Sequence, residues 1–314
     1  MPETNDVSLS DLLDEVDDKT KEEFSSKPTV EDGTDSFTVT DTAIEARKWI
    51  KLPDVVAVVS DLKNSTHLGT GKHAASTASI YEAATGGTVK IYNRFGADFV
   101  AIQGDGAFAL FWGDNRYERA LCAGVSVKTF SERHLVPRLE AKWQSHAEEH
   151  PTGFKVGIAS GRVLVKRIGT PRNPAQQEPV WAGTPVNFAT KAAQQADRHE
   201  LIITGSVWDH IETNDYLALT CPCGLGPSSK LWTDVIIDKV PEANSERSGK
   251  RLGSKWCETH GEEYVSAILS GEKKRSDSSN AREELQKSMR IDSLAAKHKK
   301  DRENLRSRRN GLRR

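Results

Sequence analysis

An uninterrupted apolar run ends in an acid at Val55-Val56-Ala57-Val58-Val59-Ser60-Asp61. β-Branched residues on consecutive positions, rather than on alternate ones, are typical of a strand that is covered on both faces. A strand of this kind needs packed layers above and below its sheet. The run therefore predicts a mixed α and β core, with Asp61 at the point where a central strand opens into a loop.

The residues around this run alternate between helical and extended patterns. Beyond the first strand, strands are predicted on both sides of Gly104-Asp105-Gly106 between 99 and 112, and at 154–159, 163–168 and 201–204. Helices are predicted at 72–84, from there to Phe95 after an interruption at Gly86-Gly87, at 116–130 and at 186–196. This order predicts an α+β fold with a ferredoxin-like sheet and flanking helices.

Two acids stand at the ends of predicted strands. Asp61 follows the buried run, and Asp105 occupies the tip of an apolar hairpin. If the two strands are neighbours, the carboxylates converge, and a carboxylate pair is what Mg²⁺ or Mn²⁺ needs when it is shared with a polyphosphate. Each acid alone also fits a structural role, because Gly-Asp-Gly is a common turn and Asp after a strand is a common helix cap.

Three ordered segments resemble the class III nucleotide cyclases. Asp61-Leu62-Lys63-Asn64-Ser65-Thr66 resembles their first metal loop, and Gln103-Gly104-Asp105-Gly106 resembles their second metal hairpin. Ala182-Gly183-Thr184-Pro185-Val186-Asn187-Phe188-Ala189-Thr190-Lys191 resembles the segment that carries a ribose-binding asparagine and an arginine four residues later. The resemblance covers residues 53–212 and implies the ferredoxin-like sheet of that family.

The resemblance also implies the roles of individual residues. Asp61, Asp105 and the backbone of Leu62 hold two Mn²⁺ or Mg²⁺ ions, and Asn187 orients the ribose. The first loop meets the phosphates through Leu62, Lys63, Asn64 and Thr66. Lys191 stands where the family has the arginine, and an ammonium cannot grip a phosphate through two parallel hydrogen bonds. Such sites form between the two subunits of a homodimer, so a homodimer is implied as well.

Both purine signatures of the family are missing. The positions that would read adenine or guanine hold Ala101 and Val180, and neither side chain forms hydrogen bonds to a base edge. A compact cyclase without these signatures resembles the bacterial pyrimidine cyclases of the Pycsar anti-phage defence system. Tyr92 and Arg94 are predicted base contacts, although Tyr92 at helical spacing also fits a core position.

Three cysteines and a histidine late in the chain form a candidate zinc set. Cys221, Cys223, Cys257 and His260 have the ligand types of a tetrahedral Zn²⁺ site, but the gap of one residue between the first two is tighter than usual. They therefore either hold a structural Zn²⁺ or are unrelated buried thiols. The set is similar to small sensor domains that follow cyclases in defence systems.

Charge is concentrated at the two ends of the chain. Residues 1–35 hold twelve acids and three lysines, and residues 271–314 hold fifteen Lys and Arg against seven acids. We therefore expect an acidic disordered tail at 1–36, a catalytic domain at 37–214, the Cys/His module at 215–270 and a basic tail at 271–314. No apolar run is long enough for a membrane helix, so we expect a cytoplasmic protein.

The predicted function is cyclisation of a pyrimidine nucleoside triphosphate, with UTP preferred over CTP, to its 3′,5′-cyclic monophosphate and diphosphate. The product is expected to act as a second messenger in anti-phage defence, through a cyclic-nucleotide-gated effector that does not bind the enzyme itself. Two alternatives stay open. The first is an adenylate cyclase with an atypical base pocket. The second is an inactive cyclase-like module that binds nucleotide.

Overall fold

The computed structural model of the chain describes residues 8–42, 44, 47–143, 149–170, 173–219 and 226–311. These residues fall into two compact units. The first comprises Met1–Pro53 with Leu164–Ala182, and the second comprises Asp54–Val163 with Gly183–Arg314. The predicted site residues all belong to the second unit.

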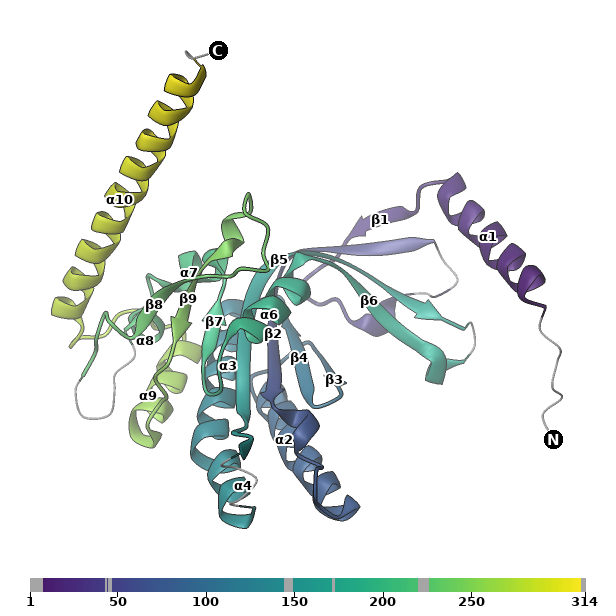
Figure 1. The fold of residues 1–314 in the computed structure, drawn as a ribbon, viewed down its shortest axis with the longest axis horizontal. Coiled ribbons are helices and arrows are strands. Elements are labelled where there is room, and N and C mark those ends of the chain that lie inside the picture. The colour runs from purple at the N-terminus through teal and green to yellow at the C-terminus, as the bar shows by residue number, and fades with distance from the viewer. Residues whose placement is uncertain are drawn as a thin grey trace. The chain divides into compact units, whose positions relative to one another are not determined.

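The strands of the second unit form one sheet in the order β3-β4-β2-β5-β7-β9-β8 (Figure 1). Their bounds are β2 (Lys48–Lys63), β3 (Phe99–Gln103), β4 (Gly106–Phe111), β5 (Gly153–Gly169), β7 (Leu201–Ile203), β8 (Trp232–Ile236) and β9 (Ser248–Leu252). β2 and β5 are long enough to continue into the first unit. There β1 (Thr29–Asp32) pairs with β2, and β6 (Gln177–Gly183) pairs with β5.

The α-helices of the second unit are α2 (Ala74–Arg94), α3 (Arg116–Phe130), α4 (Val136–Lys142), α6 (Thr184–Gln195), α7 (Gly205–Ile211), α8 (Asp215–Ala218), α9 (Glu258–Leu269) and α10 (Ser279–Gly311). A π-helical turn, η3 (Ser131–Leu135), joins α3 to α4. Short 3₁₀ turns complete the described chain: η1 (Val39–Asp41), η2 (Ser65–His67), η4 (Pro174–Gln176) and η5 (Ser245–Arg247).

Two glycines show that helices cover both faces of the sheet. A Cβ at Gly124 of α3 would come 2.8 Å from Ile158 and 3.4 Å from Val156, so α3 packs on the face to which these side chains point. A Cβ at Gly157 would overlap the backbone of α6 at Ala189. Because neighbouring residues of a strand point to opposite faces, α6 covers the other face of β5.

The central strand is buried on both faces, as its composition predicts. Residues 55–60 of β2 are all buried, and Val56 and Val58 join the core under α2 and α3. β2 pairs in antiparallel register with β4, with Val56 opposite Phe111 and Ser60 opposite Ala107. The α+β fold with a sheet and flanking helices is thus confirmed.

The predicted break at Gly86-Gly87 is wrong, because α2 runs without interruption from Ala74 to Arg94. A glycine inside a helix costs only about 1 kcal/mol, which tertiary packing easily outweighs. Gly87 is in fact required by packing, since a Cβ there would come 2.7 Å from the Phe130 ring. β5 likewise continues through the predicted gap at 160–162.

The first unit contains a helix in the segment that was expected to be a disordered tail. Helix α1 (Leu9–Ser25) begins at the cap residue Ser8, whose side chain accepts a hydrogen bond from Asp11. At the C-terminal end of α1, the Arg47 guanidinium donates a hydrogen bond to the hydroxyl of the cap residue Ser26 at 2.6 Å. None of the α1 side chains is buried, so charge patterning and capping, rather than a core, account for this helix.

The expected module at 215–270 is not separated from the rest of the second unit. Its strands β8 and β9 extend the sheet, because β9 pairs with β7. The basic segment that follows forms α10, and its first turn is anchored at Asp215. This buried carboxylate pairs with Arg282 and accepts a hydrogen bond from the Ser278 hydroxyl at 2.8 Å.

None of the helices in the described ranges is both long and apolar enough to cross a membrane.

Candidate active site

Asp61 lies near the end of β2 on the face that α6 covers. Its neighbour Leu62 is 3% exposed and belongs to the core under α2 and α3, so the Asp61 side chain points to the opposite face. The carboxylate remains partly accessible, with 37% of the side chain exposed. An acid on a rigid central strand that still reaches solvent is well placed to bind a ligand.

The hairpin between β3 and β4 brings Asp105 beside Asp61. Since Ser60 pairs with Ala107, Asp61 stands opposite Gly106 and next to Asp105. In antiparallel pairs, the α-carbons of residues that are directly or diagonally opposite each other are about 5–8 Å apart. A Cβ at Gly106 would come 2.5 Å from the Ser60 carbonyl oxygen, so only glycine allows the hairpin to approach so closely. Gly104 has a φ of 63°, which makes the tight turn before Asp105.

Lys155 of β5 forms an ion pair with Asp61 from the other neighbouring strand. Its side chain is 16% exposed and points to the same face as Asp61, because Val156 points to the face under α3. The sequence predictions missed this residue. A signal was present, however, since Lys155 is the one cation in the apolar segment Phe154–Ala159.

The loop after Asp61 is held in place by contacts to other segments. Asn64 adopts a left-handed conformation with a φ of 58°, and its side-chain amide donates to the Pro151 carbonyl oxygen at 2.9 Å. Lys63 forms an ion pair with Asp197, which lowers the pKa of that carboxyl. Thr66 is exposed in the 3₁₀ turn η2. Lys63 is thus already paired, whereas Thr66 is open to a ligand.

Helix α6 presents Asn187 and Lys191 away from the sheet. Its buried side faces β5 and β7 through Phe188, Ala189 and Ala192. Asn187 is exposed and its amide donates to the Gly183 carbonyl oxygen at 3.3 Å, while the Lys191 ammonium lies 5.3 Å from the Phe188 ring centroid. Both side chains lie one helical turn apart on a surface that a second molecule can reach.

The two predicted base contacts have very different surroundings. Tyr92 of α2 is completely buried, and burial raises the pKa of its hydroxyl. It is therefore a core residue in this structure, as its helical spacing also allowed, and a base cannot reach it there. Arg94, at the end of α2, is exposed to solvent.

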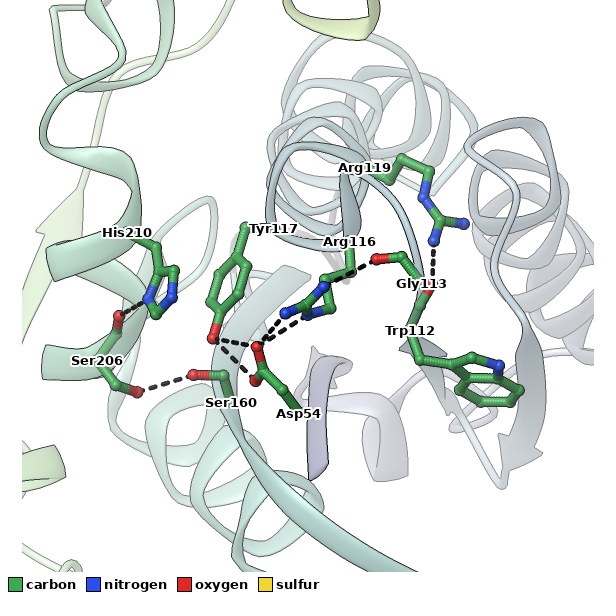
Figure 2. Close-up of polar contacts among 9 residues, drawn as sticks. All are labelled: Asp54, Trp112, Gly113, Arg116, Tyr117, Arg119, Ser160, Ser206 and His210. Carbon is green, nitrogen blue, oxygen red and sulfur yellow. Dashed lines mark hydrogen bonds and ion pairs between the residues drawn. The ribbon is translucent and has the colours of Figure 1, made fainter. Parts of the chain in front are cut away.

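A polar cluster fastens β2 to α3 at Asp54, seven residues before Asp61 (Figure 2). The Arg116 guanidinium donates to the Asp54 carboxylate at 2.6 and 2.8 Å, and the Tyr117 hydroxyl donates to it at 2.9 Å. Tyr117 also stacks on His210 of α7, with ring centroids 3.9 Å apart. The cluster fixes β2 as a rigid support for the acid at its far end.

The paired acids suit a metal that is shared with a substrate. Mg²⁺ is typically bound by one or two carboxylates together with substrate phosphates and waters. In the described ranges no three His, Cys, Asp or Glu residues gather as a metal-binding group. Asp61 near the end of β2 and Asp105 in the turn of the β3–β4 hairpin, with the Leu62 carbonyl nearby in sequence, fit a divalent cation that a polyphosphate also ligates.

The late cysteine and histidine set is only partly described. Cys221 and Cys223 lie outside the described residues, so the zinc site stays a prediction. Cys257 is the cap residue of α9, and its sulfur accepts a hydrogen bond from the His260 backbone at 3.3 Å. The His260 ring stacks on Tyr264. Cys122, on α3, is buried.

Comparison with known proteins gives the family. A search of protein-family models found no match. Among solved structures, the adenylyl cyclase CyaB from P. aeruginosa is similar with a TM-score of 0.47 and 15% sequence identity, over 65% of this chain and 93% of that one.

Two curated relatives are much more similar. A uridylate cyclase from Micromonospora echinofusca is 57% identical over 272 residues, which is 87% of this chain and 88% of the relative. A uridylate cyclase from Propioniciclava tarda is 48% identical over 298 residues, which is 94% of this chain and 95% of the relative. The chain belongs to the uridylate cyclase family.

Proposed function

We propose that this chain converts UTP into 3′,5′-cyclic UMP and pyrophosphate at a site built around Asp61 and Asp105. The observation that supports the proposal is the register of β2 with β4, which brings Asp61 against the hairpin that carries Asp105, together with the ion pair of Lys155 and Asp61. Membership of the uridylate cyclase family supports the choice of reaction and substrate. CTP is the second pyrimidine substrate to be tested.

In this reaction the ribose 3′-oxygen forms a bond to the α-phosphorus, and the bond from that phosphorus to the β-phosphate oxygen breaks. Two Mg²⁺ or Mn²⁺ ions bound by Asp61, Asp105 and the Leu62 carbonyl would neutralise phosphate charge and lower the pKa of the attacking hydroxyl. The protein then contributes mainly position and charge. No protein nucleophile is required.

Each remaining residue has a distinct task in the proposal. Lys155 would contact the triphosphate if a metal bound to Asp61 replaced their ion pair. Asn187 orients the ribose, and Lys191 places a positive charge near the transferred phosphate. Thr66 and the backbone of its loop line the phosphates, with Asn64 holding the loop to Pro151.

The proposal also includes a homodimer. Asn187 and Lys191 sit on the exposed side of α6, so a second subunit can bring them to the metals of the first. The product would serve as a second messenger in anti-phage defence, read by an effector that binds the cyclic nucleotide. Both statements rest on the resemblance to the pyrimidine cyclases of that system.

A panel of substrates tests the function. Purified full chain is incubated with Mn²⁺ and each of UTP, CTP, ATP and GTP, and the products are identified by mass spectrometry. We expect cyclic UMP as the main product and no product from Asp61→Ala. Cyclic AMP as the main product would favour the adenylate cyclase alternative, and no cyclic product from any nucleotide would favour the inactive module.

A further inference from the structure

A groove runs between α2 and α4, on helices that the proposed reaction does not use. The cavity has a volume of about 320 Å³, within the ~300–1,000 Å³ range of ligand pockets. Its floor is apolar and includes Ile80, Phe130 and Leu139. We call it the α2–α4 groove, and all of its lining residues belong to the second unit.

One wall of the α2–α4 groove is a row of small residues. Ser79, Ala83 and Gly87 follow one another at intervals of four along α2, so they share one face of that helix. Ser79 and Ala83 are exposed. Small side chains over about 12 Å, which is two helical turns, leave space for the backbone of another helix to approach.

The opposite wall is a row of basic side chains, of which Arg138 and Lys142 are cations. His134, Arg138 and Lys142 also follow at intervals of four, from the π-helical turn η3 into α4. All three are exposed, and within the described ranges no carboxylate pairs with any of them. A π-helical turn inside a helix is often found at functional sites. The groove thus has one wall of small side chains, on α2, and one wall with positive charge, on η3 and α4.

A buried ammonium lies in a smaller cavity beside the groove. The groove ends at Trp143, beyond which a smaller cavity is lined by Lys72, Leu68 and Thr152. The Lys72 Nζ atom is buried without a hydrogen-bond partner among the described residues, 5.7 Å from the Trp143 ring centroid. Burial lowers the pKa of this amine. Glu140 of α4 lines the same smaller cavity. The attraction for an acidic guest is therefore assigned to Arg138 and Lys142 of the groove itself.

We propose that the α2–α4 groove is a docking site for an acidic amphipathic helix of a partner protein. The guest lies along the two walls with its apolar side chains against Ile80 and Leu139 and its acidic side chains along the row of basic side chains. This is the helix-in-groove mode of recognition, in which anchors at i, i+3, i+4 and i+7 enter an apolar groove. Binding needs neither nucleotide nor metal, so it is independent of the proposed reaction.

A defined peptide tests the docking site. The probe is a fluorescein-labelled 18-residue helix with Leu at i, i+3, i+4 and i+7 and Glu elsewhere, and its binding to the full chain is followed by fluorescence anisotropy. We expect saturable binding that weakens as salt increases. A peptide with Lys in place of Glu should bind about tenfold more weakly or worse.

Matched variants locate the binding. Ala83→Trp fills the groove from an exposed position, and Glu82→Trp places the same side chain on α2 outside the lining. Arg138→Glu combined with Lys142→Glu reverses the charge of one wall, and Lys90→Glu reverses an exposed charge elsewhere. We expect at least a tenfold loss of affinity for the groove variants and less than a twofold change for both controls.

Three results would overturn the proposal. One is unchanged affinity in both groove variants when circular dichroism shows that they are folded. Another is equal binding of the Lys peptide. The third is binding that appears only after the exposed leucines of α1 are replaced, since the groove would then belong to a segment of this chain and not to a partner.

Discussion

At the residue scale, Lys155 has a role that follows from its surroundings. Its ammonium pairs with Asp61 on a neighbouring strand, and it lies on the face where the proposed triphosphate would bind. Lys155→Met removes this charge, and we expect kcat/KM for UTP to fall about 10- to 100-fold, the loss expected for a charged hydrogen bond. Lys155→Arg should restore most of the activity.

Initial rates of cyclic UMP formation measure this effect. Lys90→Met is the matched control, because Lys90 is an exposed cation on α2 outside the proposed site. A Lys155→Met variant that is folded and as active as the wild type would remove Lys155 from the mechanism.

His199 gives the protein a predictable response to pH. Burial lowers the pKa of its imidazole, although Glu132 opposes this, and Arg198, Lys128 and Lys255 act in the same direction as burial. Below pH ~6.5 the unfolded chain therefore binds a proton more readily than the folded one. The free energy of unfolding should thus decrease as pH falls from 7.5 to 5.5.

The variant His199→Asn tests this response. His199 has a φ of 63°, and asparagine tolerates this left-handed backbone while carrying no titratable group. Urea unfolding at pH 7.5 and 5.5 should show a smaller loss of stability in the variant than in the wild type. The assignment fails if the two proteins lose the same amount.

At the scale of elements, α6 is positioned by its close contact with β5. A Cβ at Gly157 would overlap the backbone of α6, so Gly157→Ala must displace the helix that carries Asn187 and Lys191. We expect a loss of about 1–3 kcal/mol in unfolding free energy, as for overpacked cores, together with reduced activity. Chemical denaturation measures the first effect.

Gly86→Ala is the matched control for this substitution. Nothing lies within 4 Å of a Cβ at Gly86, and this residue is in the middle of α2. The same change should therefore raise stability by about 0.5–1 kcal/mol through helix propensity. Equal effects of the two substitutions would contradict the close packing of α6 on β5.

The sequence predicted the elements that have strong periodicity and missed those that depend on tertiary contacts. The buried run of β2, the hairpin around Asp105 and helix α3 were predicted because their composition alone determines them. The continuity of α2 through Gly86 and Gly87 was not, since it depends on the fit of Gly87 against Phe130. Strands β6, β8 and β9 have little apolar patterning, so pairing with a neighbour defines them.

The same distinction applies to the site. Asp61 and Asp105 could be found from their positions at strand ends, and the structure then brings Gly106, the residue after Asp105, against Asp61. Lys155 could not be assigned a partner from sequence, because an ion pair across strands depends on register. Tyr92 was proposed from its position before the hairpin, yet its complete burial excludes contact with a base in this structure.

At the scale of the whole molecule, the proposed active site needs two chains. If metals bind one subunit and Asn187 comes from the other, Asp61→Asn and Asn187→Ala each inactivate both sites of a homodimer. A mixture that exchanges subunits contains half heterodimers, each with one intact site of two. We therefore expect the mixture to recover about a quarter of wild-type activity.

Mixing the two inactive variants and following cyclic UMP over time tests this arrangement. Each variant alone should stay inactive under the same conditions. If the mixture is as inactive as its components after subunit exchange has been verified, the site is formed within one chain and the dimer proposal is wrong.

The account depends on Asp61 and Asp105 acting together on UTP. The most direct measurement is the rate of cyclic UMP and pyrophosphate formation from UTP with Mn²⁺ by the wild type, Asp61→Asn and Asp105→Asn, with Asp114→Asn, an exposed acid in the turn after β4, as control. We predict that both site variants lose at least about 100-fold in kcat while remaining folded, and that the control keeps its activity. Near wild-type rates in either site variant would contradict the proposed site.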